Sequence, residues 1–276
     1  MPELPEVQTV IEGIKPKILN KKILDFKKYV SKLRYPISNS IRKKIKGKFV
    51  KGIYRRAKYI IIDLEENESI VIHLGMSGRI IILESGHNQL FKHTHFIIKF
   101  SNKIKLIYID PRRFGLIKLL SSNYLFKSKI FSHLGVEPLG KEFSGRHLKK
   151  ICENTKSSIK STIMNQKNVV GVGNIYASES LFLAKINPLK KSSSLTIQEC
   201  NLIVQSVKKV LNKSIKQGGS SINDYAMVSG KLGNYQNKLE VYGRDGLICR
   251  KRTCKSEILR IVIAQRSTFY CPVCQK

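Results

Sequence analysis

The stretch from residue 22 to residue 120 constrains the fold most, because it contains strand-length apolar segments with no helical segment between them. Turn sequences such as Glu65-Glu66-Asn67-Glu68 separate these segments. Strands that follow one another directly pair as antiparallel sheets, so this region is predicted to be an antiparallel β-sandwich or barrel. The segments expected to be strands are Lys48–Arg56, Lys58–Leu64, Ser69–Leu74, Arg79–Leu83, His95–Phe100, Lys105–Asp110 and Phe114–Leu120.

A helix is expected before this strand region. Val7, Val10, Ile11 and Ile14 are spaced as one face of a helix, and Pro16 is expected to end it. The predicted sandwich therefore has a flanking helix on its N-terminal side.

The pattern becomes helical from Ser144 onward. Thr196-Ile197-Gln198-Glu199 is a capping-box sequence, and it is predicted to open a long helix that runs to Gly218-Gly219. A second box, Ser221-Ile222-Asn223-Asp224, is predicted to start a short helix. We therefore expect a multi-domain α+β chain: a sandwich domain over 1–126, a linker over 127–142, a helical domain over 143–240 and a cysteine-rich module over 241–276.

The charge balance indicates a polyanionic partner. The chain has 51 basic and 19 acidic residues, so its formal net charge is 51 − 19 = +32. Nucleic acid is the favoured partner, ahead of an anionic membrane surface or a ribosome. Apolar runs are too short to cross a bilayer and no secretory signal is visible, so the sequence predicts a cytoplasmic protein.

The cysteines indicate a metal site. Cys249, Cys254, Cys271 and Cys274 follow a C-x4-C-x16-C-x2-C pattern at the end of the chain. Two close pairs separated by a hairpin-length segment suit one structural zinc ion held by four thiolates. Strands are expected over Ile258–Ile263 and Ser267–Tyr270, with Gln265 and Arg266 at or near the turn between them.

The first residues could carry chemistry. Removal of Met1 would leave Pro2 as a terminal secondary amine, which can attack an aldehyde-like carbon and form an iminium. Glu3 would stand beside it as an acid or base. Pro5 and Glu6 are equally ordinary residues for the first turn of a helix, so the terminus alone does not decide between the two interpretations.

Several turns carry residues suited to nucleic acid. Val169-Val170-Gly171-Val172-Gly173-Asn174 could present helix N-terminal amides and the Asn174 side chain to a phosphate, or could simply permit a tight turn. Arg55–Tyr59 opens a strand with three cations. His73–Gly78 and Asp110–Gly115 place Met76, Arg112 and Phe114 in turns, where apolar or planar side chains can enter a base stack.

Taken together, these stretches resemble the bacterial formamidopyrimidine-DNA glycosylases, which belong to one superfamily with endonuclease VIII. The matching segments lie in order along nearly the whole chain: Pro2–Val7, Arg55–Tyr59, His73–Gly78, Asp110–Gly115, Val169–Phe182, Gln217–Gly219, Val241–Arg244 and Ala264–Cys274. The resemblance implies an N-terminal β-sandwich and a helix–two-turn–helix domain that ends in a zinc hairpin. It also implies excision of 8-oxoguanine and formamidopyrimidines from double-stranded DNA, and cleavage at abasic sites. The resemblance further implies a nucleoid-associated protein that acts as a monomer.

The resemblance assigns four catalytic residues. Pro2 would attack the sugar C1′ and form the Schiff base, and Glu3 would handle protons at the sugar. Lys58 would donate a proton during β-elimination. Arg266 would serve δ-elimination and grip a phosphate.

The resemblance also assigns the DNA contacts. Met76, Arg112 and Phe114 would fill the space that the extruded base leaves. The other positions implied to contact DNA are His93, Lys160, Asn174 and Tyr242, and residues 229–240 are implied to read the damaged base.

The sequence departs from the family pattern in the first cysteine pair, which is C-x4-C rather than C-x2-C, and at Gln8, where glutamate is common. Two alternatives stay open: an endonuclease VIII-like enzyme for oxidised pyrimidines, and a non-enzymatic zinc-ribbon protein that only binds nucleic acid.

Overall fold

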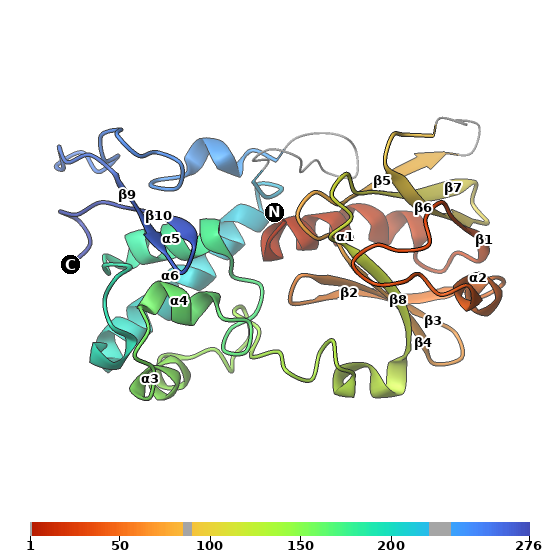
Figure 1. Ribbon diagram of the computed structural model, residues 1–276, viewed down its shortest axis with the longest axis horizontal. Coiled ribbons are helices and arrows are strands. Elements are labelled where there is room, and N and C mark those ends of the chain that lie inside the picture. The colour runs from red at the N-terminus through yellow and green to blue at the C-terminus, as the bar shows by residue number, and fades with distance from the viewer. Residues whose placement is uncertain (1, 85–89, 221–232) are drawn as a thin grey trace. The chain divides into compact units, whose positions relative to one another are not determined.

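The computed structural model describes residues 2–84, 90–220 and 233–276, which form two compact units (Figure 1). Unit 1 comprises Met1–Ser132 with Gln217–Gln236, and unit 2 comprises His133–Lys216 with Asn237–Lys276. The predicted short helix at 221–224, and part of the expected base-reading segment, lie outside the described residues. Among the described residues, no helix has the length and apolar character needed to cross a membrane.

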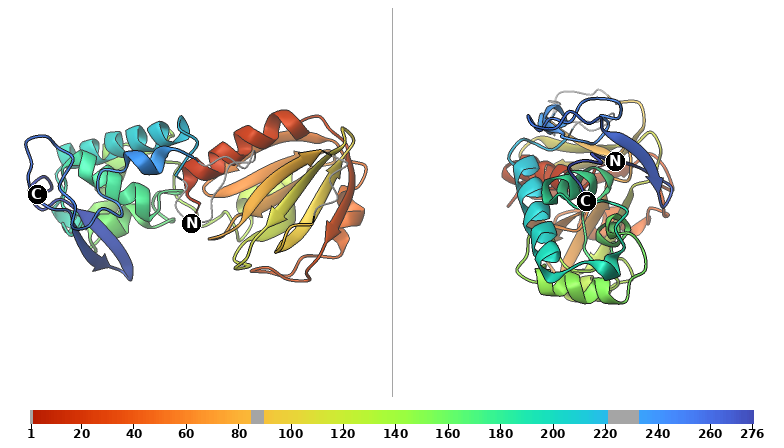
Figure 2. Two further views of the ribbon diagram at one scale, coloured as in Figure 1. Left: turned by 90° about the horizontal axis from the view of Figure 1, so that it is seen from above. Right: turned by 90° about the vertical axis from the view of Figure 1, so that its left-hand side faces the viewer.

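Unit 1 contains two antiparallel four-stranded sheets, as predicted. One sheet has the order β2-β3-β4-β8 and the other β1-β6-β7-β5. Figures 1 and 2 show α1 running along these sheets. The elements are α1 (Leu4–Ile18), β1 (Ile23–Lys28), α2 (Ser40–Ile45), β2 (Val50–Arg56), β3 (Tyr59–Leu64), β4 (Glu68–His73), β5 (Arg79–Glu84), β6 (Thr94–Phe100), β7 (Ile104–Ile109), β8 (Leu116–Ser121) and the 3-10 turn η1 (Ser122–Lys127).

One hydrophobic core joins α1 to both sheets. Along β3, Ile60, Ile62 and Leu64 point into this core, as the two-residue repeat of a strand requires. The helix contributes its predicted face, including Ile14. The prediction that Pro16 ends the helix is wrong, because α1 continues to Ile18. Proline removes one backbone N–H donor, and within the last turn of a helix this loss does not prevent the chain from completing the turn.

In unit 2, α3 and α5 pack against α6, and the C-terminal hairpin packs against α5. Thr196 and Glu199 form the predicted capping box at the start of α6. The predicted hairpin is also present. Leu259 pairs with Tyr270 at its open end, and Ile263 pairs with Arg266 next to the turn. The elements are α3 (Gly145–Glu153), α4 (Ile159–Met164), α5 (Asn174–Ala184), η2 (Ser192–Ser194), α6 (Ile197–Ile215), β9 (Leu259–Ile263) and β10 (Arg266–Tyr270). The 3-10 turn η3 (Tyr235–Lys238) spans the boundary where the chain passes from unit 1 into unit 2 for the second time.

The aromatic stack inside the sandwich gives a stability prediction. Phe96 is fully buried, and its ring stacks on Tyr108 with centroids 4.8 Å apart. We expect Phe96→Ala to lower the free energy of unfolding by about 3–5 kcal/mol, because it removes a large apolar side chain and leaves a cavity. Urea denaturation measures this loss. Tyr124→Ala is the control, since Tyr124 is 66% exposed and its loss should cost less than about 0.5 kcal/mol. Equal losses in the two variants would contradict the core assignment.

Candidate functional site

A buried glutamate holds the N-terminal segment in place. Glu6 is 1% exposed, and its Oε2 accepts a hydrogen bond of 2.8 Å from the Glu3 N–H. Its Oε1 accepts a second hydrogen bond of 2.8 Å, from the Ser220 N–H. Gly219 lies against the same carboxylate at φ +78°, where a Cβ would stand 3.0 Å from Oε1. Glu6 therefore joins the buried Pro2–Glu3 segment to the chain after α6. Sequence analysis treated Glu6 as an ordinary helix residue and missed this role.

Lys58 lies in the tight hairpin between β2 and β3, where it is 8% exposed. Ala57 precedes it with φ 54°, a left-handed conformation that a non-glycine residue adopts at some cost. The Arg55 guanidinium donates to the Ala57 carbonyl at 3.0 Å and to Gln8 Oε1 at 3.3 Å. Gln8 thus keeps a side-chain oxygen acceptor where glutamate is common, and the hairpin is tied to α1.

His73 is a neighbour of Lys58 that sequence analysis did not single out as a site residue. Its Nδ1 accepts a hydrogen bond of 2.9 Å from the Gly75 N–H, and its ring packs on Tyr59 with centroids 4.8 Å apart. Burial, together with the positive charges of Lys58 and Arg34, lowers the pKa of His73 to about 4. His73 is therefore neutral at physiological pH, with its proton on Nε2.

Two turns of unit 1 present the side chains expected to enter the base stack. Met76 is 38% exposed and Phe114 is 47% exposed, so neither has entered the core. The Arg112 guanidinium lies over the Phe114 ring at 4.9 Å from its centroid. The turns touch at Gly75, where a Cβ would lie 2.6 Å from the Phe114 carbonyl carbon. The structure thus brings Met76, Arg112 and Phe114 onto adjoining turns.

His93 lies in the turn before β6 and has φ 64°. Its carbonyl accepts a hydrogen bond of 3.1 Å from the Asp110 N–H, at the end of β7. This contact places His93 beside the segment that carries Arg112 and Phe114.

In unit 2, Lys160 is a buried cation that joins α4 to the hairpin. It is 1% exposed, and its Nζ donates to Asn174 Oδ1 at 2.6 Å, to Thr268 Oγ1 at 2.7 Å and to the Ser267 carbonyl at 3.2 Å. Asn174 in turn donates to the Ser267 carbonyl at 2.9 Å. Asn174 is the first residue of α5 and not its cap, which is Gly173. The Asn174 side chain therefore does not cap the helix and instead donates to the Ser267 carbonyl of β10.

Arg266 follows the two-residue tip of the hairpin and is exposed. The tip residues Ala264 and Gln265 have φ 46° and 60°, the sign that the tightest hairpin turns require. Ile263, Ala264 and Arg266 line one cavity of about 190 Å³ together with Lys160, Ser161, Met164 and Asn165 of the α4 region. Arg266 is the exposed cation of this cavity, because the Lys160 ammonium is buried and already donates to Asn174, Ser267 and Thr268.

A second buried glutamate positions Tyr242. Glu179 is 3% exposed on α5, and its carboxylate accepts hydrogen bonds of 2.9, 3.0 and 2.9 Å from the N–H groups of Glu240, Val241 and Tyr242. Burial raises the pKa of Glu179, and the backbone donors act in the opposite direction. The Tyr242 ring then packs edge-on against Phe269 of β10. Glu179 is a further residue that sequence analysis missed.

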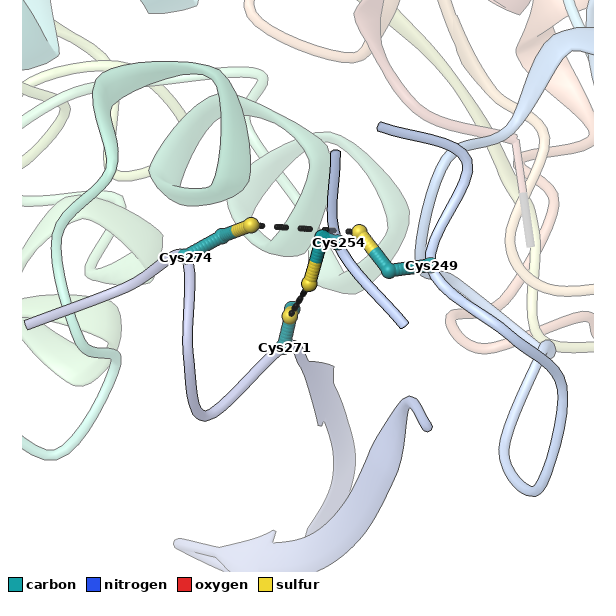
Figure 3. A group of neighbouring side chains, drawn as sticks. All are labelled: Cys249, Cys254, Cys271 and Cys274. Atoms are coloured by element: carbon teal, nitrogen blue, oxygen red, sulfur yellow. Dashed lines mark hydrogen bonds between the residues drawn. The ribbon is translucent and has the colours of Figure 1, made fainter. Parts of the chain in front are cut away.

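The four cysteines predicted to bind metal come together. Figure 3 shows Cys249, Cys254, Cys271 and Cys274 converging, and all four sulfur atoms lie within 4.8 Å of one another. The contacts Cys249–Cys274 and Cys254–Cys271 measure 3.9 and 3.6 Å. A tetrahedral Zn²⁺ with Zn–S bonds of about 2.3 Å requires sulfur atoms about 3.8 Å apart, so the cluster fits zinc despite the two extra residues in the first pair.

We expect the zinc content to depend on this cluster alone. Cys271→Ser should reduce bound zinc well below one ion per chain, because a serine hydroxyl is a poor ligand for this metal. Cys200→Ser is the control, since Cys200 is buried on α6 away from the cluster, and it should keep the metal. Elemental mass spectrometry of the purified proteins measures both. Equal zinc in the two variants would contradict the assignment.

The environment of His73 predicts a pH dependence of stability. Its pKa of about 4 lies below the ordinary value of 6.5. Between these values the unfolded chain binds a proton that the folded chain does not, so the free energy of unfolding should fall as the pH drops from 6.5 to 4. His73→Asn keeps an acceptor for the Gly75 N–H and should remove this part of the slope. Urea titrations at several pH values test it, and identical slopes for both proteins would refute it.

Known protein families and individual proteins match this chain along its length. Three family models match: "Formamidopyrimidine-DNA glycosylase N-terminal domain" over residues 1–117, "Formamidopyrimidine-DNA glycosylase H2TH domain" over 134–226 and "Zinc finger found in FPG and IleRS" over 249–276. The formamidopyrimidine-DNA glycosylase of Wolbachia pipientis subsp. Culex pipiens is 44% identical over 275 residues, with both chains fully covered.

Solved structures from Lactococcus lactis are also similar. A complex of a point mutant of its FPG with DNA containing Fapy-dG matches with a TM-score of 0.91, 34% identity and full coverage of both chains. A complex of the wild-type enzyme with DNA containing an oxidised pyrimidine matches with a TM-score of 0.90 at the same 34% identity, again with full coverage of both chains. The matches confirm the resemblance seen in the sequence and extend along the whole chain. The chain therefore belongs to the formamidopyrimidine-DNA glycosylase family.

Proposed function

We propose that this member of the family is a bifunctional enzyme of base excision repair, which removes oxidised purines from double-stranded DNA and then cleaves the strand as an abasic-site lyase. The observation that carries the proposal is the anchored N-terminus. Glu6 holds the Glu3 N–H at 2.8 Å, directly after the residue that would become the terminal amine. A nucleophile on a free terminus needs such an anchor, because a mobile chain end would not stay aligned for attack.

The Pro2 amine would begin the reaction. After removal of Met1, its nitrogen attacks the sugar C1′, a C1′–N bond forms, and the glycosidic bond to the base breaks. Glu3 would assist by moving protons at the sugar ring, and the departing base takes up a proton. Opening of the sugar ring gives an iminium that is linked to the chain through Pro2.

Strand cleavage would use the same intermediate. The iminium acidifies the C2′ proton, whose loss expels the 3′ phosphate in β-elimination, and a second elimination expels the 5′ phosphate. Lys58 would transfer protons in the first elimination, and its place in the rigid β2–β3 hairpin supports this role. Arg266 would stabilise the departing phosphate in the second, and the exposure of its side chain beside the hairpin tip supports this role.

The remaining site residues would bind the duplex. Met76, Arg112 and Phe114 would occupy the space that an extruded base leaves, and their exposure on adjoining turns supports this assignment. His93, Asn174 and Tyr242 would contact the backbone. Lys160 would act by fixing Asn174 and β10, because its Nζ already donates to atoms of both.

The net charge of +32 would supply a strong, salt-dependent attraction to DNA. We propose on this ground that the protein is held at chromosomal DNA, where it would act as a monomer. One zinc ion held by the four cysteines would stabilise the hairpin and take no part in the reaction.

A second substrate class is favoured by one observation, the similarity to a complex with an oxidised pyrimidine. Parallel excision assays on duplexes with 8-oxoguanine and with thymine glycol rank the two. Faster release of 8-oxoguanine is the expected result, and faster release of thymine glycol would assign endonuclease VIII-like specificity.

The role of Pro2 can be tested by trapping. Borohydride reduces an iminium to a stable amine, so the protein should become covalently linked to DNA that carries 8-oxoguanine. Pro2→Gly should nearly abolish the linked product. Pro16→Ala is the matched control, because Pro16 is an exposed proline on α1, the helix that follows Pro2, and it should trap normally. Efficient trapping by protein that retains Met1 would contradict the mechanism, and binding with no cleavage of abasic DNA would indicate a non-enzymatic nucleic-acid binder.

A further inference from the structure

We infer that Asp110 is the positioning residue that holds the base-replacing side chains of unit 1 in register, through hydrogen bonds to both of the turns that carry them. This inference rests on the proposed function. Asp110 stands at the end of β7 and is fully buried. It does not reach the surface where DNA would bind, so it acts through its neighbours.

The carboxylate of Asp110 binds one group from each turn. Its Oδ1 accepts from Ser77 Oγ at 2.6 Å, next to Met76 in the chain. Its Oδ2 accepts from the Gly115 N–H at 2.8 Å, next to Phe114. A change in either bond would therefore shift one exposed side chain relative to the other.

Ser77 links the turn of Met76 directly to the turn of Arg112. While its hydroxyl donates to Asp110, the same Oγ accepts a hydrogen bond of 3.1 Å from the Arg112 N–H. The turn with Met76 thus also fixes the backbone of Arg112. Main-chain groups of Asp110 extend the arrangement, since its N–H donates to the His93 carbonyl at 3.1 Å and its carbonyl accepts from the Arg113 N–H at 3.2 Å.

Buried neighbours keep Asp110 itself in one position. Tyr108 donates from its hydroxyl to Oδ2 at 3.1 Å, and His95 Nε2 lies 2.6 Å from the Asp110 carbonyl oxygen. Burial and the Asp110 charge raise the pKa of Tyr108 well above its ordinary value, so this hydroxyl stays a donor at physiological pH. A carboxylate with several donors inside a low-dielectric core is held far more firmly than one in water.

Firm placement matters because a base-replacing side chain acts by filling a space of fixed shape. Extrusion of a base forfeits stacking and pairing, and the inserted side chains must recover part of that loss. At an abasic site no base has to be extruded, so this requirement is weaker. Loss of Asp110 should therefore harm base excision more than cleavage of a ready-made abasic site.

The sandwich offers a matched control in Asp63. Its Oδ1 accepts from Ser69 Oγ at 2.6 Å and from the Tyr54 hydroxyl at 3.4 Å, the same pair of partner types. These groups lie on β2, β3 and β4, away from the turns of Met76 and Phe114. Asp63→Asn removes a similar carboxylate from the same unit without touching the proposed arrangement.

The experiment compares Asp110→Asn with Asp63→Asn under single-turnover conditions. We expect Asp110→Asn to slow excision of 8-oxoguanine from duplex DNA about tenfold or more, and to slow cleavage of an abasic site less than about threefold. Asp63→Asn should leave the ratio of the two rates unchanged. Partial unfolding lowers both rates together, so the ratio separates positioning from stability.

A second readout and a second variant complete the test. Fluorescence of 2-aminopurine beside the lesion should report slower insertion of the base-replacing side chains in Asp110→Asn. Ser77→Ala should change the ratio of excision rate to abasic-site cleavage rate in the same direction, whereas Ser69→Ala should leave that ratio unchanged. An unchanged ratio in both Asp110→Asn and Ser77→Ala would overturn the inference. Failure of the unmodified protein to excise or to cleave would instead overturn the proposed function.

Discussion

The placement of the site depends on buried carboxylates that accept hydrogen bonds from backbone N–H groups. Glu6 does this for the N-terminal segment, Asp110 for the turns of the sandwich, and Glu179 for the segment around Tyr242. An unpaired buried carboxylate is costly, whereas one that satisfies several donors fixes each of those donors in space. In a chain with only 19 acidic residues against 51 basic ones, acids used in this way also stay off the surface and leave its positive field intact.

These anchors are needed because many of the functional side chains of unit 1 lie in turns, where no sheet ladder or helical repeat determines the backbone. Left-handed conformations at Ala57, His93, Arg113 and the Ala264–Gln265 tip adjoin or coincide with proposed site residues. Each such conformation costs free energy that the surrounding structure must supply. The regular elements supply this free energy, since α1 and both sheets of unit 1 contribute side chains to one hydrophobic core. The core therefore provides stability, whereas the buried carboxylates fix the positions of the functional side chains.

The sequence was sufficient for the elements whose signal is local and repetitive. Strand-length apolar segments separated by turn residues predicted β2 to β8, the Thr196–Glu199 box predicted the start of α6, and cysteine spacing predicted the zinc cluster. It was insufficient for α2, which is only six residues long, and for Pro16, whose cost depends on its distance from the helix end. The anchors were missed for a different reason. Glu6 and Ser220 are 214 positions apart, and no local pattern marks such a partner.

The zinc cluster has a consequence for a protein of a family that acts on oxidatively damaged DNA. Thiolates are attacked by the same peroxides and radicals that convert guanine to its lesions, and an oxidised sulfur no longer holds the metal. Three of the four ligands are buried, whereas Cys274 is partly accessible. Cys274 is thus the ligand that diffusing oxidants meet first. The oxidising conditions that damage DNA would therefore also limit how long the zinc-bound hairpin with Arg266 stays folded.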